Sequence, residues 1–195
     1  MVNNNFKELI DRLKDTGYPT EPDKVYIKIP NAEQRLRGGL NYFTQGDFEW
    51  VEKNYRPVVE WMEDNKGKGL ILSGGCGLGK SLIGMRILPL LINDTNRKIV
   101  NVYKAQELNT KPDDIINKHI IYIDDIGTEG LSNVYGNKRI PFCELCDAVE
   151  QNGKLLMCST NLTVDELKEK YGIRTVDRLR ATTKYIPFFG DSLRK

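Results

Sequence analysis

The sequence has 195 residues, of which 39% are hydrophobic and 29% are charged, and its formal net charge is +2. Since a domain averages about 150 residues, this length predicts one globular domain with a modest extension. The charged fraction is slightly above the roughly 25% of ordinary globular chains, and the apolar content is sufficient for a core, which excludes wholesale disorder. A net charge this small also excludes a protein that binds polyanions over its whole surface.

The first residues lack the apolar stretch that is typical of a secretory signal. The first eight are polar and then amphipathic, and the longest apolar run, residues 87–92, is far shorter than the roughly 20 residues of a membrane span. We therefore expect a cytoplasmic protein without membrane contact. The four cysteines should then be free thiols, and a zinc site at Cys143 and Cys146 is disfavoured because the chain has a single histidine.

The first 46 residues predict a helix followed by an irregular arm. Residues 4–15 form an amphipathic helical pattern, with apolar side chains at Phe6, Leu9, Ile10 and Leu13. In residues 20–46, prolines and glycines surround a short apolar alternation at 25–29, which favours irregular chain with one brief strand at most. This segment is interpreted as a linker or mobile arm.

The remainder, residues 47–195, predicts one domain with its leading helix. That helical pattern runs from Asp47 to about Asn65, and Pro57 is expected to kink or divide it. From Gly69 onward strand and helix patterns alternate, which indicates an α/β fold with a mostly parallel sheet. The predicted strands are residues 70–73, 99–103, 120–124, 155–159 and 185–188. The predicted helices are residues 80–92, 113–118, 138–151 and 163–180, the last broken near Gly172.

A glycine-rich segment after the first predicted strand has the pattern of a phosphate-binding loop. The segment Gly74-Gly75-Cys76-Gly77-Leu78-Gly79-Lys80-Ser81 fits G-x-x-x-x-G-K-[ST] and precedes a predicted helix. Glycines let backbone N–H groups point at a phosphate chain, and the helix presents its positive N-terminal end. The pattern predicts that Lys80 meets the β and γ phosphates and that Ser81 ligates Mg²⁺.

Two carboxylates end the third predicted strand. The segment His119-Ile-Ile-Tyr-Ile-Asp124-Asp125 is apolar until its last two residues, which is typical of a Walker B strand. Asp124 would hold magnesium through water, and Asp125 would orient or polarise the attacking water. Glu129 is a reserve candidate for the second role.

Three further polar residues are candidates for the same site. The strand predicted at 155–159 leads to Asn161, which places an amide beside the two carboxylates and near a γ-phosphate. Arg174 and Arg178 are four residues apart and share a helix face, so they form either a solvated surface or an arginine offered to a neighbouring subunit's nucleotide. Residues 168–195 hold eight basic and three acidic side chains, an excess that could meet phosphates.

Four segments together resemble the DnaC/DnaI-type replicative helicase loaders, which are AAA+ ATPases. They are the phosphate loop, Ile-Asp-Asp-Ile-Gly-Thr-Glu at 123–129, Ser-Thr-Asn-Leu-Thr-Val-Asp-Glu-Leu at 159–167 and Tyr-Gly-Ile-Arg-Thr-Val-Asp-Arg-Leu at 171–179. The resemblance covers about residues 66–195. It implies a three-layer P-loop NTPase (AAA+/ASCE) fold with a parallel sheet of about five strands, helices on both faces and no C-terminal helical lid.

The same resemblance implies an activity and its partners. It implies ATP and Mg²⁺ as cofactors, ATP hydrolysis, assembly on a replicative DNA helicase and self-association with a nucleotide shared between subunits. It places sensor 1 at Asn161 and an arginine finger at Arg178 or Arg174, with Arg178 the first choice. The segment between the second and third strands is shorter than in such loaders, which predicts weak single-stranded DNA binding, mainly through the basic C-terminal segment.

Several alternatives stay open at the level of sequence. An IstB-like transposition helper ATPase shares the same core and differs in its partner. An ATP-binding module without turnover is a further alternative, because Asp125 stands where many AAA+ proteins have glutamate. The N-terminal helix either binds the helicase or packs back on the core.

Overall fold

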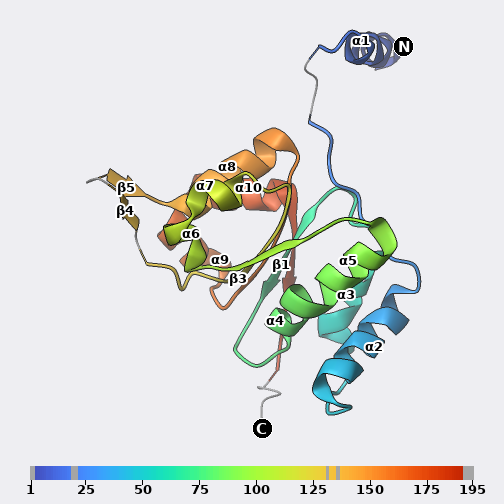
Figure 1. The fold of residues 1–195 in the computed structure, drawn as a ribbon, viewed down its shortest axis with the longest axis vertical. Coiled ribbons are helices and arrows are strands. Elements are labelled where there is room, and N and C mark those ends of the chain that lie inside the picture. The colour runs from blue at the N-terminus through green and yellow to red at the C-terminus, as the bar shows by residue number, and fades with distance from the viewer. Residues whose placement is uncertain (1–2, 19–21, 131, 135–136, 191–195) are drawn as a thin grey trace.

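The computed structural model describes residues 3–18, 22–130, 132–134 and 137–190. Five parallel strands form its main sheet in the order β2-β3-β6-β1-β7 (Figure 1). Their bounds are Gly69–Ser73 (β1), Asn101–Lys104 (β2), Ile120–Ile126 (β3), Leu155–Thr160 (β6) and Thr183–Pro187 (β7). The predicted α/β class and all five predicted strands are confirmed.

Helices cover both faces of this sheet (Figure 1). One face carries α2 (Ala32–Thr44), α3 (Glu52–Glu63) and the helical segment after β1, which comprises α4 (Lys80–Leu82), the π-helical turn η1 (Ile83–Ile87) and α5 (Leu88–Asn96). The other carries α6 (Glu107–Thr110), α7 (Pro112–Ile116), α8 (Pro141–Asn152), α9 (Val164–Tyr171) and α10 (Ile173–Thr182). The molecule therefore has three layers, as expected.

The sheet divides the core into two clusters of buried side chains. Leu70 and Leu72 of β1 pack into the first cluster, whereas Ile71 packs into the second. Successive side chains of a strand point to opposite faces, so a strand covered on both faces must be apolar at every position. This explains why the interior strands β1 and β6 are largely apolar runs in the sequence, whereas the edge strands β2 and β7 are only partly buried.

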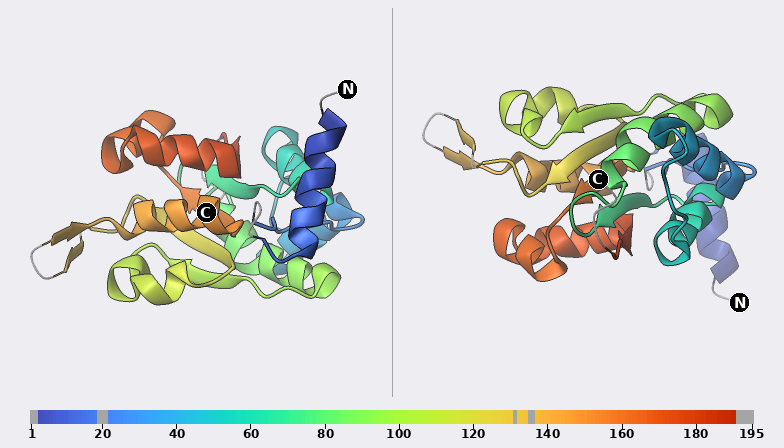
Figure 2. Two further views of the ribbon diagram at one scale, coloured as in Figure 1. Left: turned by 90° about the horizontal axis from the view of Figure 1, so that it is seen from above. Right: turned by 90° about the horizontal axis from the view of Figure 1, so that it is seen from below.

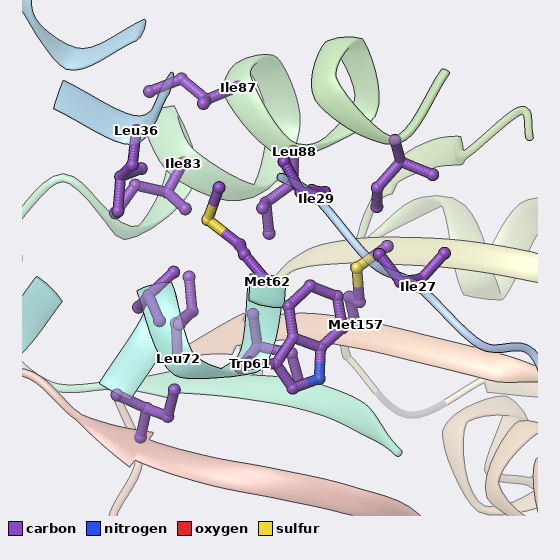
Figure 3. Packing of buried hydrophobic residues seen from close by; sticks show 14 of the residues in the cluster. Ile27, Ile29, Leu36, Trp61, Met62, Leu72, Ile83, Ile87, Leu88 and Met157 are labelled. Carbon is purple, nitrogen blue, oxygen red and sulfur yellow. The ribbon is translucent and has the colours of Figure 1, made fainter. Parts of the chain in front are cut away.

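The expectation of irregular chain over residues 20–46 is wrong. Residues 32–44 form α2, and its Leu36 and Leu40 are fully buried in the first cluster. Figure 3 shows Leu36 among buried side chains of other elements, with Ile27 and Ile29 in the same cluster. Two glycines hide this helix in the sequence. Gly39 is needed there, because a Cβ would lie 2.9 Å from Cγ2 of Ile87.

In the chain before α2, the side chain of Asn65 makes backbone hydrogen bonds that a neighbouring strand would make in a sheet. Asn65 accepts the N–H of Ile27 at Oδ1 (2.9 Å) and donates from Nδ2 to the carbonyl of Val25 (3.0 Å). Ile29 donates its N–H to the carbonyl of Met62 at 2.8 Å. The alternation at residues 25–29 thus marks extended chain whose backbone bonds go to Met62 and Asn65 near the end of α3 and to the side chain of Asn96 at the end of α5, and no strand forms there.

Four other features differ from expectation, and one of them is the short helix α6, which was not predicted. α3 begins at Glu52 instead of Asp47 and continues undivided through Pro57, whose missing N–H costs one bond near the helix start. An antiparallel hairpin of β4 (Ser132–Val134) and β5 (Asn137–Arg139) was not predicted, and it extends away from the body (Figure 2). Helix α8 therefore begins at Pro141 and not at residue 138.

Helix α1 (Asn3–Asp15) matches the predicted N-terminal helix and lies apart from the three layers (Figures 1 and 2). Phe6 is 67% exposed, and among the described side chains none of α1 belongs to either buried cluster. Its apolar stripe is therefore not packed on the core. Among the described residues, no helix has the length and apolarity of a membrane span.

Candidate nucleotide-binding site

The phosphate loop lies at the carboxyl end of β1, between that central strand and α4. Gly74, Gly77 and Gly79 have φ values of +141°, +81° and +83°, which side chains other than glycine rarely adopt. At Gly74 a Cβ would also lie 2.4 Å from the carbonyl oxygen of Phe188. Backbone conformation therefore requires three glycines of the motif, and close packing adds a second requirement at Gly74.

Lys80 is folded back over the loop. Its Nζ donates to the carbonyls of Gly74 (2.8 Å) and Gly75 (2.7 Å) and to Oδ1 of Asn161 (3.0 Å), and the residue is 5% exposed. Asn161 also donates from Nδ2 to Sγ of Cys76 at 3.5 Å. The structure therefore brings together the lysine and the amide that the sequence placed 81 residues apart.

Asp124 is buried at the end of β3 and is held by two hydroxyls. The Tyr122 hydroxyl (2.9 Å) and the Ser159 hydroxyl (2.6 Å) both donate to its Oδ1. Burial, with the neighbouring Asp124 carboxylate as a second cause, raises the pKa of Tyr122 well above its usual value, which keeps it a donor. Sequence reasoning missed both hydroxyls, although Tyr122 shares the strand face of Asp124 by its two-residue spacing.

Asp125 points in a different direction because the strand is irregular there. The pairing of β3 with β6 shifts register between Ile123 and Ile126, and Asp125 has a left-handed φ of +56°. Aspartate is one of the few residues that tolerate this region, and a bulge next to a site often re-aims a side chain. The N–H of Asp125 donates to Oγ of Ser159 at 2.9 Å, so Ser159 holds the carboxylate of Asp124 and the backbone of Asp125.

The phosphate loop, Asp125 and Asn161 line one cavity of about 270 Å³, close to the lower end of the usual range for small-molecule sites, about 300 Å³. Its opposite wall comes from the N-terminal part of the chain and was not predicted: Leu40, Thr44, Asp47, Phe48 and Tyr55. Burial raises the pKa of Tyr55. The cavity thus combines a polar phosphate-loop side with an apolar, aromatic side.

Glu129 turns away from this cavity. It is 5% exposed, it accepts the hydroxyl of Tyr171 at Oε1, and it accepts the N–H of Gly127 at Oε2 (2.8 Å). Lys170 donates to the carbonyls of Gly127 (2.5 Å) and Glu129 (2.9 Å). These bonds from α9 fix the loop that follows Asp125, so the geometry gives Glu129 a supporting position instead of the reserve role in activating water.

The two arginines lie on α10, and neither lines the cavity of its own chain. Arg178 pairs with Asp147 and with Glu150 (2.9 Å) of α8, and its side chain is 14% exposed. Arg174 is exposed and makes no ion pair within the part of the chain that the structure describes.

Asp124 does not line the cavity, although it is next to Asp125, which does, and the donor set at and beside the cavity suits a magnesium nucleotide. Ser81 and Asp124 offer a hydroxyl and a carboxylate, the hard oxygen ligands that Mg²⁺ prefers. The loop N–H groups and Lys80 suit phosphate oxygens. The bonds of Tyr122 and Ser159 to Asp124 both reach Oδ1, which leaves Oδ2 for a metal-bound water.

Comparison with solved structures identifies the fold. The chain is similar to DnaI (19% identity, TM-score 0.52, covering 83% of this chain and 84% of that one). It is similar to the DnaC helicase loader (16%, 0.50, 87% and 94%) and to AMPPCP-bound DnaA from Aquifex aeolicus (13%, 0.55, 75% and 50%). The predicted resemblance to DnaC/DnaI-type AAA+ proteins is thereby confirmed for the fold.

Comparison with sequences gives the family. No curated protein matches the chain. The model of one family, described as novel STAND NTPase 3, matches residues 51–188, from the start of the leading helix to the end of the last strand. Because this match covers most of the sequence and includes the phosphate loop, the chain belongs to the novel STAND NTPase 3 (nSTAND3) family.

Proposed function

We propose that this NTPase binds and hydrolyses ATP and acts as a DNA replication helicase loader. The observation that carries the ATPase proposal is the convergence of Lys80, Asp125 and Asn161 on one cavity at the phosphate loop. The loader proposal is supported by the shared fold with DnaI and with the DnaC helicase loader.

Each residue of the site has a proposed role. Loop N–H groups and Lys80 bind the phosphates, with Lys80 exchanging the two carbonyls and the amide it now contacts for phosphate oxygens. Ser81 and Asp124 hold Mg²⁺, which when bound neutralises charge on the phosphate oxygens. Asp125 orients the attacking water, and Asn161 contacts the γ-phosphate as sensor 1. Phe48 and Tyr55 form the wall against which the base stacks.

We further propose that subunits self-associate and share the nucleotide, with Arg178 as the arginine finger. To act in a neighbouring site, Arg178 has to leave Asp147 and Glu150. Arg174, on the same helix and exposed, is the alternative that needs no such change.

The N-terminal helix is the proposed contact with the helicase. Its stripe of Phe6, Leu9, Ile10 and Leu13 is not packed on the core, and amphipathic helices commonly bind in apolar grooves of partners. We place the boundary of the ATPase domain near Val25 instead of residue 46, because the chain from Val25 onward contributes to the first buried cluster.

Phosphate release from ATP by the purified protein, compared with its Lys80→Ala variant, tests the enzymatic proposal. We expect turnover in the parent protein and none in the variant, because the variant lacks the charge that meets the β and γ phosphates. ATP binding without turnover in the parent protein would instead support the ATP-binding module. Capture of the host helicase in a pull-down would support the loader. Tight binding of duplex DNA without capture of the helicase would instead support the transposition helper.

A further inference from the structure

The parallel sheet gathers lysines at the edge opposite the nucleotide site. Because β2, β3, β6 and β1 are adjacent and parallel, the turns before them lie along one edge. A lysine occurs within three residues before each of these strands: Lys98, Lys118, Lys154, and both Lys66 and Lys68. We call these five residues the amino-edge lysines.

The strand starts beside these lysines are spaced regularly by the sheet. Neighbouring strands are about 4.8 Å apart, so four strands span about 14 Å and place a positive charge at each step. Lys24 extends the row, since its side-chain stem lies beside Gly67, where a Cβ would be 3.1 Å from Cβ of Lys24. A linear polyanion, with a phosphate every few ångströms, matches such a row better than one small anion does.

Part of the row surrounds a cavity. Lys24, Lys66, Lys68 and Lys154 line a space of about 330 Å³ between three turns. Lys154 is half-buried, and its Nζ donates to the carbonyl of Ile116, the last residue of α7. Burial lowers the pKa of Lys154, because its charge is partly removed from water without a carboxylate in contact.

Carboxylates near these lysines do not neutralise them. Glu150 lines the same cavity but is paired with Arg178 at 2.9 Å, and Asp64 accepts the backbone N–H of Lys66. Asp23 is exposed beside Lys24. Within the described chain, neither Lys24 nor any amino-edge lysine has a carboxylate within ion-pair distance.

Several basic side chains of the C-terminal segment, which the sequence favoured for phosphate contacts, are occupied by contacts within the molecule. Lys168 pairs with Asp165 (2.8 Å), and Lys184 pairs with Glu60 (3.1 Å). Arg178 pairs with two acids of α8, and Lys170 donates to two backbone carbonyls. Four of the six basic side chains described in this segment are thus engaged within the molecule, whereas Arg174 and Arg180 are exposed and make no ion pair with another described residue.

We propose that the amino-edge lysines, together with Lys24, form a binding surface for the phosphate backbone of single-stranded nucleic acid. The surface lies at the opposite end of the strands from the phosphate loop, so nucleic acid and nucleotide bind without competing. This inference does not depend on ATP hydrolysis or on the helicase.

Fluorescence anisotropy tests it, using a labelled oligothymidylate of about 20 nucleotides, longer than the roughly 4–16 that one single-strand-binding fold covers. The test variant is Lys66→Glu/Lys68→Glu. The matched control is Lys168→Glu/Arg180→Glu, which changes the net charge equally in the C-terminal segment. Losing two phosphate contacts should reduce the slope of log affinity against log salt concentration by about 1.4, which corresponds to about 25-fold weaker binding near 0.1 M salt. The control variant should lose less than about threefold in affinity.

The result that supports the surface is this selective loss, with binding of a fluorescent ATP analogue retained in both variants. Equal losses in the two variants, a larger loss in the control, or no binding by the parent protein would overturn it. Full displacement of the oligonucleotide by equimolar pyrophosphate would also overturn it. So would binding of the parent protein to phosphatidylserine vesicles that is stronger than its binding to the oligonucleotide. Failure of the ATPase proposal would appear separately, because the parent protein would release no phosphate from ATP while the selective loss of oligonucleotide binding remained.

Discussion

At the scale of single residues, the site depends on one hydroxyl that no motif identifies. Ser159 donates to the carboxylate of Asp124 and accepts from the backbone N–H of Asp125, so it holds both residues in place. The sequence predicts both carboxylates and Asn161, because apolar strands that end in polar residues are recognisable. It does not predict their support, because a serine inside an apolar strand has many equivalent uses.

The division of roles between the two carboxylates gives a prediction. Asp124→Asn should weaken Mg²⁺-dependent nucleotide binding, because it removes the buried charge that faces the metal. Asp125→Asn should bind nucleotide normally and hydrolyse it poorly, because it loses the group that orients water. Titration with a fluorescent nucleotide, with and without Mg²⁺, measures binding, and phosphate release measures turnover. Equal effects of both changes on binding would contradict the assignment.

Tyr171 gives a second prediction, for a residue that acts through Glu129 on the loop after Asp125. Tyr171→Phe removes a hydrogen bond to a buried carboxylate, which is worth about 1.5–3 kcal/mol. If that bond positions Asp125, kcat should fall, by up to about the 100-fold that a 1 Å misplacement costs, while KM for ATP stays the same.

The control for Tyr171→Phe is Thr183→Val, which removes a buried hydroxyl bond to Leu179 at the amino end of β7, away from the cavity. Steady-state kinetics and thermal unfolding are measured for both. A purely structural role predicts a lowered melting temperature and unchanged kcat in both variants, and that result would remove Tyr171 from the mechanism.

At the scale of elements, the sequence predicts the sheet well and the N-terminal layer poorly. β1, β3 and β6 are found because they are buried on both faces and read as short apolar runs. α2 is missed because Gly38 and Gly39 resemble a turn, and the reason for Gly39 is a contact with Ile87, which lies 48 residues away. The hairpin β4–β5 is missed because nothing in its composition distinguishes it from a loop.

α2 gives the prediction at this scale. Leu36→Ala should lower the free energy of unfolding by about 2–5 kcal/mol, the usual cost of truncating a buried leucine, since Leu36 is fully buried. Tyr42→Ala, on the same helix but 78% exposed, should stay within about 0.5 kcal/mol. Urea denaturation measures both. If Leu36→Ala costs no more than Tyr42→Ala, residues 32–44 are a mobile arm after all.

At the scale of the whole molecule, α1 lies apart from the three layers, which predicts separable functions. Deleting residues 1–17 removes no side chain of either described cluster, so the free energy of unfolding and ATP binding should be unchanged. Capture of the host helicase should be lost if the stripe binds it as a helix in a groove. Pull-down and nucleotide titration of the truncated chain provide the two measurements. Undiminished helicase capture would place the partner contact elsewhere.

A nucleotide shared between subunits gives the last prediction, because neither Arg174 nor Arg178 reaches the cavity of its own chain. Arg178→Ala should bind ATP and fail to hydrolyse it, whereas Lys80→Ala fails at its own phosphate loop. When Arg178→Ala and Lys80→Ala subunits are mixed and shown to co-assemble, some interfaces pair an intact phosphate loop with an intact arginine. These interfaces should restore part of the turnover, since an arginine finger contributes about 10³–10⁵ in rate.

The same mixing experiment with Arg174→Ala in place of Arg178→Ala identifies which arginine is the finger. Arg178 has to break its pairs with Asp147 and Glu150 before it can act, whereas Arg174 is already exposed. Recovery in the Arg178→Ala mixture, with full activity of Arg174→Ala alone, assigns the finger to Arg178 and means that assembly breaks those pairs. Full activity of Arg178→Ala alone would show that this residue only joins α10 to α8.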